Sequence, residues 1–114
     1  MDEQTIVPSA PPRREAWVDL PKEYPGFRFK MWVNAPQRLW NDVTGGGDEV
    51  GKAALSKIVL EHNGWVDSDG APYPALPDPE FWEAIPTELL AVMLTMAQLE
   101  MMKLPNSLAP KRRR

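Results

Sequence analysis

Apolar residues recur every three or four positions through residues 86–104 (PTELLAVMLTMAQLEMMKL), and this spacing predicts a helix with two apolar stripes. The first stripe consists of Leu90, Leu94, Ala97, Met101 and Leu104. The second consists of Leu89, Val92, Met96 and Leu99. A small domain needs one such stripe to close its core, so the second needs an explanation of its own.

Two explanations stay open for the second stripe. A fully buried central helix is apolar on all sides. Alternatively, the stripe is an interface, either for a second copy or for another protein, and the methionines of this helix suit an adaptable binding surface. On the interface hypothesis, the predicted partner-binding residues are Leu89, Val92, Met93, Met96, Leu99 and, from a separate segment, Trp32.

Strand patterns occupy the first third of the chain. Residues 27–33 alternate, with Phe27, Phe29, Met31 and Val33 on one side, and period two predicts a half-buried strand. Trp32 falls on the opposite, polar side with Arg28 and Lys30, either stacked under a helix or at an interface, where tryptophan is enriched. Residues 16–20 predict a shorter strand that Pro21 ends.

The rest of the chain predicts helices. Residues 36–44 and 48–62 form two of them, the second with Gly51 allowing a close neighbour, and residues 78–82 begin a short third one. A minor hairpin is expected around the turn at residues 67–70. The predicted fold is α+β, mainly α, with a small N-terminal β element followed by three to four helices. We expect a proline-rich arm (1–15), one domain (16–105) and a basic tail (106–114).

Composition narrows the possible functions. The chain has no cysteine, which excludes disulfides, thiolate metal sites and a cysteine nucleophile. Residues 111–114 supply four of the 13 basic residues, so residues 1–110 carry a formal charge of −7, which argues against nucleic-acid binding by the domain. The acidic N-terminus lacks a signal-peptide pattern, and Glu88, Glu100 and Lys103 argue against a membrane span.

No residues form a convincing catalytic or metal site. His62 is the only histidine and has no sequence partner for catalysis or metal binding. Residues 67–70 (DSDG) look like the start of a calcium loop, but position 12 of such a loop would be Asp78 rather than Glu, so a turn explains them better. The triple glycine at 45–47 lacks the residues of a phosphate loop. We therefore predict neither enzyme activity, nor a cofactor, nor a metal.

A series of short motifs resembles the tail assembly chaperones of long-tailed, siphovirus-like bacteriophages. The motifs are Tyr-Pro-Gly-Phe at 24–27, Trp-Val-Asn at 32–34, His-Asn-Gly-Trp at 62–65, Asp-Ser-Asp-Gly-Ala-Pro-Tyr-Pro at 67–74, Phe-Trp at 81–82 and Ile-Pro-Thr-Glu-Leu-Leu at 85–90. The resemblance covers roughly residues 17–104 and does not extend to the prolines at 8–12 or to the basic end.

The resemblance implies a non-enzymatic protein of the host cytoplasm. Such chaperones coat the tape measure protein, keep it soluble, help to recruit the tail tube protein, and leave before the virion matures. Many are also made as a longer, frameshifted product. The implied partners are therefore the tape measure protein and the tail tube protein, in addition to possible self-association.

Two other functions stay open. A structural virion protein, such as a tail completion or head–tail connector protein, would use the same apolar stripe in a permanent ring. A small nucleic-acid-binding accessory protein would act through the basic tail, whose charges can neutralise phosphates.

Overall fold

A computed structural model describes residues 12–103 of the chain, with two hairpin-connected strands at its N-terminal end. Strand β1 (Glu15–Asp19) pairs antiparallel with β2 (Arg28–Trp32), in a register that sets Val18 opposite Phe29. The alternation predicted for residues 27–33 is confirmed, because Phe29 and Met31 are fully buried while Arg28 lies on the open face.

A third strand corrects the predicted architecture. Helix α2 (Gly47–Ile58) ends four residues earlier than expected, and β3 (Val59–His62) follows it directly and pairs antiparallel with β2. The fold is α+β, but the prediction that the sheet is confined to a small N-terminal β element, with helices and a minor hairpin after it, is wrong, because the sheet has the order β1-β2-β3 and takes its third strand from mid-chain. Val59 has an extended backbone, and its side chain is buried by the pairing of β3 with β2. A buried apolar residue at this position therefore fits a strand as well as the continued helix that the sequence predicted.

The helices otherwise agree closely with their predicted positions. They are α1 (Gln37–Gly45), α2, α3 (Glu80–Ala84) and α4 (Thr87–Met101). Gly46 alone separates α1 from α2, and Gly47 begins α2 with a φ of +82°, a conformation that favours glycine. The minor hairpin is confirmed by an isolated bridge between Val66 and Pro72.

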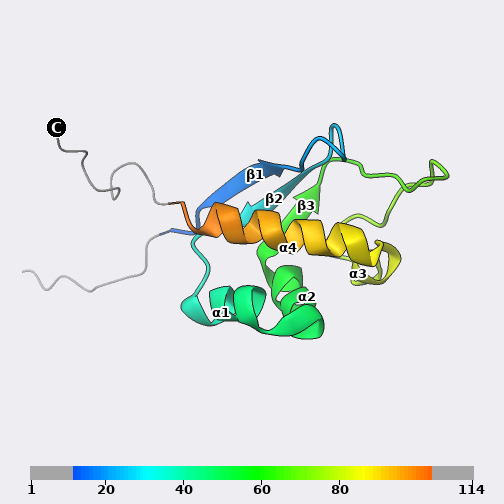
Figure 1. Cartoon of the computed structure of the whole chain (residues 1–114). Helices are drawn as coiled ribbons and strands as arrows, with labels where there is room; N and C mark the ends of the chain where they lie inside the picture. Colours follow the sequence, from blue (N-terminus) through cyan, green and yellow to red (C-terminus); the bar gives the residue numbers. More distant parts are fainter. Residues whose placement is uncertain (1–11, 104–114) are drawn as a thin grey trace, which may run out of the picture.

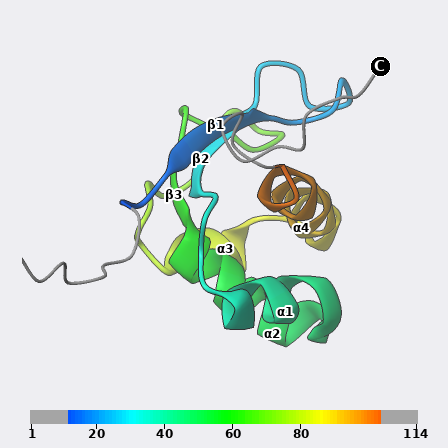
Figure 2. The same ribbon diagram turned by 90° about the vertical axis from the view of Figure 1, so that its left-hand side faces the viewer.

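The helices are arranged in layers below the sheet. Figures 1 and 2 show α4 under β1 and above the α1–α2 pair, with α3 beside it. Most of the circumference of α4 is therefore covered by neighbours, whereas one flank faces outward in Figure 2. A core of 19 buried apolar residues fills the space between the sheet and the helices.

Aromatic side chains form one end of this core. Trp65 lies between Phe27 and Phe81, at ring-centroid distances of 5.0 and 5.7 Å. Its indole N–H donates to the carbonyl oxygen of Arg28 at 2.9 Å and to Asn63 Oδ1 at 3.0 Å, so the buried donor is satisfied. The loop from β3 to α3 is thereby joined to the sheet.

Candidate functional site

The outward flank of α4 is the most unusual surface of the described chain. Its exposed line consists of Glu88, Ala91, Thr95, Leu99 and Met102. Leu99 and Met102 are 51% and 64% exposed. No charged residue occurs between Glu88 and Glu100, although the solvent face of a helix normally carries charges. We call this face the α4 face, and beyond Glu88 at its start it lacks the charged residues that a surface exposed only to water usually has.

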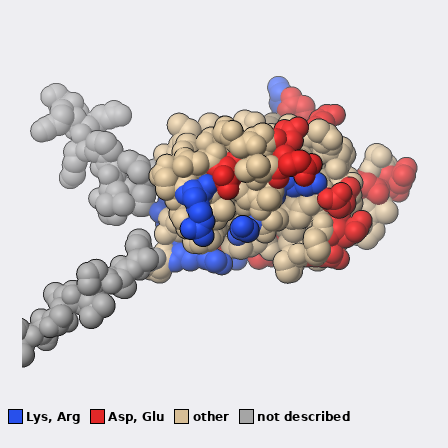
Figure 3. All heavy atoms as spheres, turned by 90° about the horizontal axis from the view of Figure 1, so that it is seen from below, with Lys and Arg blue, Asp and Glu red and all other residues tan. Residues whose placement is uncertain are grey.

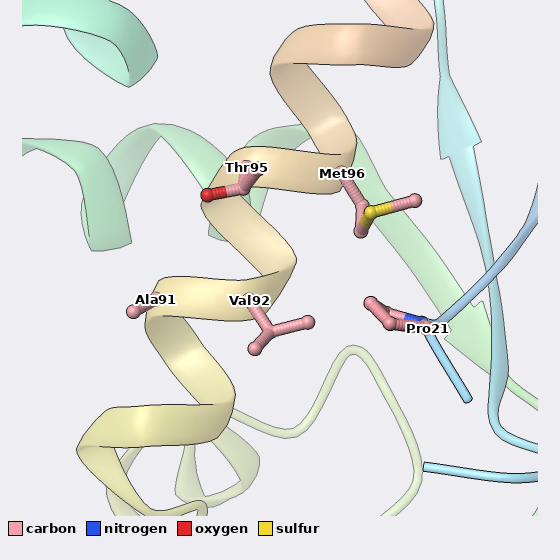
Figure 4. A pocket seen from close by; sticks show the side chains of 5 residues that line it. All are labelled: Pro21, Ala91, Val92, Thr95 and Met96. Carbon is pink, nitrogen blue, oxygen red and sulfur yellow. The ribbon is translucent and has the colours of Figure 1, made fainter. Parts of the chain in front are cut away.

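A shallow groove lies along one side of the α4 face. It has a volume of about 210 Å³ and is lined by Pro21, Ala91, Val92, Thr95 and Met96. In Figure 4, Val92, Met96 and Pro21 turn toward one another, while the Thr95 hydroxyl points away from them. A dry cavity of about 150 Å³ can hold a benzene-sized molecule. The groove is therefore of the right size and polarity for one aliphatic side chain.

The structure divides the predicted partner-binding stripe between core and surface. Leu89 and Met93 are 2% and 0% exposed, so neither is available to a partner in this conformation. Val92 and Met96 are half-buried and line the groove, and Leu99 is exposed. Partner binding itself stays a prediction, but its candidate residues on α4 are now Val92, Met96 and Leu99.

Sequence reasoning missed the small members of the α4 face. Ala91 and Thr95 precede Leu99 at intervals of four, so they share its side of the helix. The available signal was the run of eleven uncharged residues from Leu89 to Leu99, which covers all sides of the helix, including the one that points to water.

The opposite apolar stripe of α4 faces α1 and α2. Leu90 and Ala97 are buried, Leu94 and Met101 are half-buried, and Leu104 lies outside the described residues. The Nε2 amide of Gln98 donates to the carbonyl oxygen of Val43 in α1 at 3.1 Å. This stripe closes the core, as predicted for one of the two.

The loop between β1 and β2 supplies the far wall of the groove. Pro21 stands in this loop, and the hydroxyl of Tyr24 donates to Glu88 Oε2 on α4 at 3.2 Å. Burial and the negative charge of Glu88 raise the pKa of Tyr24 above its usual value. The hydrogen bond joins the loop to the first turn of α4, next to the groove.

Trp32 lies away from α4, on the open face of the sheet. The guanidinium of Arg13 lies 4.3 Å from the centre of its ring, a cation–π arrangement, and its buried Nε1 has no hydrogen-bond partner among the described residues. Trp17 is 38% exposed on the same face and has Arg28 at 5.3 Å. The structure thus does not bring Trp32 together with the predicted residues of α4.

The other sequence candidates have structural partners. His62 Nδ1 accepts the backbone N–H groups of Gly64 and Trp65, both at 3.1 Å, and its ring stacks on Phe81. Asp67 Oδ1 accepts the N–H groups of Asp69 and Ala71, both at 2.9 Å, which forms an Asx turn. Within residues 12–103, no three His, Asp or Glu side chains gather in a way that could hold a metal ion.

Charge is distributed unevenly over the face of the molecule that Figure 3 shows. Figure 3 shows acidic side chains gathered toward the side on which α3 lies in Figure 1, and basic side chains toward the opposite side. Among the described residues, none of the helices combines the length and the apolar character needed to cross a bilayer.

Comparisons with protein-family models, with curated proteins and with solved structures found no match.

Proposed function

We propose that this protein is a non-enzymatic tail assembly chaperone of a long-tailed bacteriophage, acting in the host cytoplasm. In this proposal it coats the tape measure protein, keeps it soluble, and promotes assembly of the tail tube around it. The observation that carries the proposal is the α4 face, a helix surface with no charged residue between Glu88 and Glu100 and with an apolar groove beside it.

A helical client fits this surface physically. A long helical protein has apolar stripes that lack partners until assembly, and an amphipathic helix can place such side chains in a groove on another helix. The groove next to Pro21 takes one aliphatic side chain, and the small side chains of Ala91 and Thr95 let a second backbone approach closely. The client chemistry that we propose is therefore an amphipathic helix without charges on its apolar stripe.

Release at assembly fits a small docking surface. One groove and about three helical turns offer limited contact area, so each copy binds weakly. Many copies bound along one client nevertheless cover it, because neighbouring sites on a long chain act together. The acidic balance of the domain supports this arrangement, since coated clients repel one another.

The experiment is co-expression with the phage's tape measure protein, followed by tagged purification. We expect the two proteins to co-purify, with the chaperone in molar excess. Leu99→Asp should abolish co-purification, because a carboxylate would have to be buried in the contact. The matched control is Val50→Asp, which changes an exposed valine on α2 (43% exposed) and should leave binding unchanged.

Two results would contradict the proposal. Equal loss of binding in both variants would assign the effect to general acidity rather than to the α4 face. Retention of this protein in purified virions, in a ring of fixed stoichiometry, would instead support a structural tail protein.

A further inference from the structure

The α4 face is complementary to itself when two copies are placed antiparallel. Thr95 lies at its centre, with Ala91 and Leu99 four residues away on either side, which is about 6 Å along the helix in each direction. An antiparallel pair with its two-fold axis at Thr95 therefore places Ala91 of each copy level with Leu99 of the other. We propose that the protein forms a reversible homodimer through this face and that the dimer covers the face before the client does.

Size complementarity supports this pairing. Of the two residues that flank Thr95 on the face, Leu99 is the large one and is 51% exposed, and Ala91 is the small one. Leu99 lies on the same side of the helix as Val92 and Met96, so in the antiparallel pair it meets the groove of the second copy, beside Ala91, Val92 and Pro21 (Figure 4). The knob of one copy thus enters the hole of the other, twice, as a two-fold interface requires.

Charge complementarity sets the same register. Glu88 lies in the first turn of α4 and Lys103 lies two residues past its last helical residue, so the antiparallel pair brings the end that carries Glu88 of each copy toward the end that carries Lys103 of the other. Within its own copy, Glu88 accepts the Tyr24 hydroxyl, and Lys103 pairs with Glu100 at 3.0 Å. Lys103 is 69% exposed, so its side chain can reach a second carboxylate. A parallel pair would instead place Glu88 beside Glu88.

The surroundings of α4 leave room for a second helix. Figure 2 shows β1 above α4 and the α1–α2 pair below it, with no described element over the outward flank. The contact is limited to about four turns of one helix per copy, less than the roughly 800 Å² per partner of stable complexes. We therefore expect a weak dimer whose formation depends on protein concentration.

The dimer would be the form of the protein in the absence of client, with the α4 face covered. Because the second copy and the client helix would occupy the same face, dimer and client-bound monomer exclude each other; this part of the inference rests on the proposed function. Free chaperone would hide its apolar face, and client binding would draw monomer out of the dimer.

Cysteine cross-linking tests the dimer directly, because the chain has no cysteine of its own. Thr95→Cys places the new thiol on the two-fold axis, and a short thiol–thiol cross-linker should convert most of the protein to a covalent dimer. Ala53→Cys, an exposed position on α2, is the matched control and should give little dimer. Equal cross-linking of both variants, or none of Thr95→Cys at concentrations up to 1 mM (about the weakest affinity worth testing), would overturn the dimer.

Charge reversal tests the register independently. Glu88→Lys and Lys103→Glu should each weaken association about threefold or more in sedimentation equilibrium, because two like-charge contacts replace two attractive ones. The double variant Glu88→Lys/Lys103→Glu should recover most of the loss. Failure of the double variant to recover, with its helical circular dichroism unchanged, would contradict the antiparallel register.

The dimer and the proposed function can fail separately. A tape measure fragment that co-purifies with the protein should suppress the Thr95→Cys cross-link when it is added in excess. If no fragment co-purifies while the cross-link forms, the client is wrong and the dimer stands. If a fragment binds and the cross-link persists unchanged, the shared face is wrong.

Discussion

Leu94 of α4 lies against the backbone of Gly51 in α2. A Cβ atom at residue 51 would lie only 3.0 Å from Leu94 Cδ2, closer than side chains normally approach. The lack of a side chain at Gly51 predicts a close neighbour, and the structure identifies that neighbour as α4, the helix that carries the α4 face.

The first prediction follows from this contact. Gly51→Val should lower the free energy of unfolding by about 1–3 kcal/mol, because three added carbon atoms must displace Leu94 or move α2. Urea unfolding followed by circular dichroism measures the change. Ala53→Val, an exposed substitution two residues away on α2, should cost only about 0.7 kcal/mol or less. Because valine has a higher helix propensity than glycine, an unchanged or increased stability of Gly51→Val would show that the contact with Leu94 leaves room for a side chain.

The second prediction separates the core side of α4 from its outward face. Met93→Ala should lower the free energy of unfolding by about 2–5 kcal/mol, because Met93 is fully buried. Leu99→Ala should change it by about 0.5 kcal/mol or less, since Leu99 is 51% exposed. Both values come from the same urea series at low protein concentration. A large loss for Leu99→Ala would show that Leu99 belongs to the fold and not to a docking surface.

The third prediction concerns the hydrogen bond between Tyr24 and Glu88. Burial and the charge of Glu88 raise the pKa of Tyr24, so its phenol should ionise above pH 10 in the folded protein. The resulting contribution to stability is present below the pKa of unfolded tyrosine and is lost as the pH rises through the folded pKa. Ultraviolet titration in a Tyr73→Phe background isolates Tyr24, because the chain has two tyrosines.

Glu88→Gln supplies the control for that titration. It removes the charge but keeps an acceptor, and the pKa of Tyr24 should fall toward its usual value without reaching it, since burial, the larger cause, remains. An unchanged titration curve in Glu88→Gln would show that the loop containing Pro21 is not held against α4 in solution.

The fourth prediction concerns the tautomer of the neutral His62 ring. Because Nδ1 accepts two backbone N–H groups, the neutral ring must have its hydrogen on Nε2, which donates to the carbonyl oxygen of Pro74 at 2.9 Å. Nitrogen-15 NMR of the neutral ring should show the hydrogen on Nε2 and none on Nδ1. His62→Ala should lower the free energy of unfolding by about 1–3 kcal/mol, since three hydrogen bonds and the stack on Phe81 are lost. An Nδ1-protonated ring would contradict this geometry.

Local sequence patterns predicted the four helices and the first two strands of this fold, but not the third strand of its sheet. Phe29 and Met31 showed their strand clearly because their polar neighbours alternate with them. Val59 and His62 did not, since a spacing of three suits a helix as well as the bulged pairing of β3 with β2. Residues 59–62 form a strand because they pair with β2. This pairing joins segments that are distant in the sequence, so the local pattern does not reveal it.

Only part of the candidate site was predicted, because the sequence of a helix does not show how the helix is placed in the fold. A helix that is apolar on all sides does not show which side its neighbours cover. Leu89 and Met93 turned out to lie against the core, whereas Leu99 lies outside it, because α4 is placed between β1 and the α1–α2 pair. Pro21 could not be assigned to the groove at all from the sequence, since it lies about seventy residues from Val92.

The direct passage from α2 into β3 has a mechanical consequence. No residue separates Ile58 from Val59, so α2 is joined to the sheet without a loop that could absorb a movement. A partner that displaces α4 pushes on α2 through Leu94 and Gly51, and α2 cannot tilt without straining the ladder between β2 and β3. Occupancy of the helix surface should therefore affect the far edge of the sheet, where faster amide exchange along β3 would show that the hydrogen bonds between β2 and β3 have been strained.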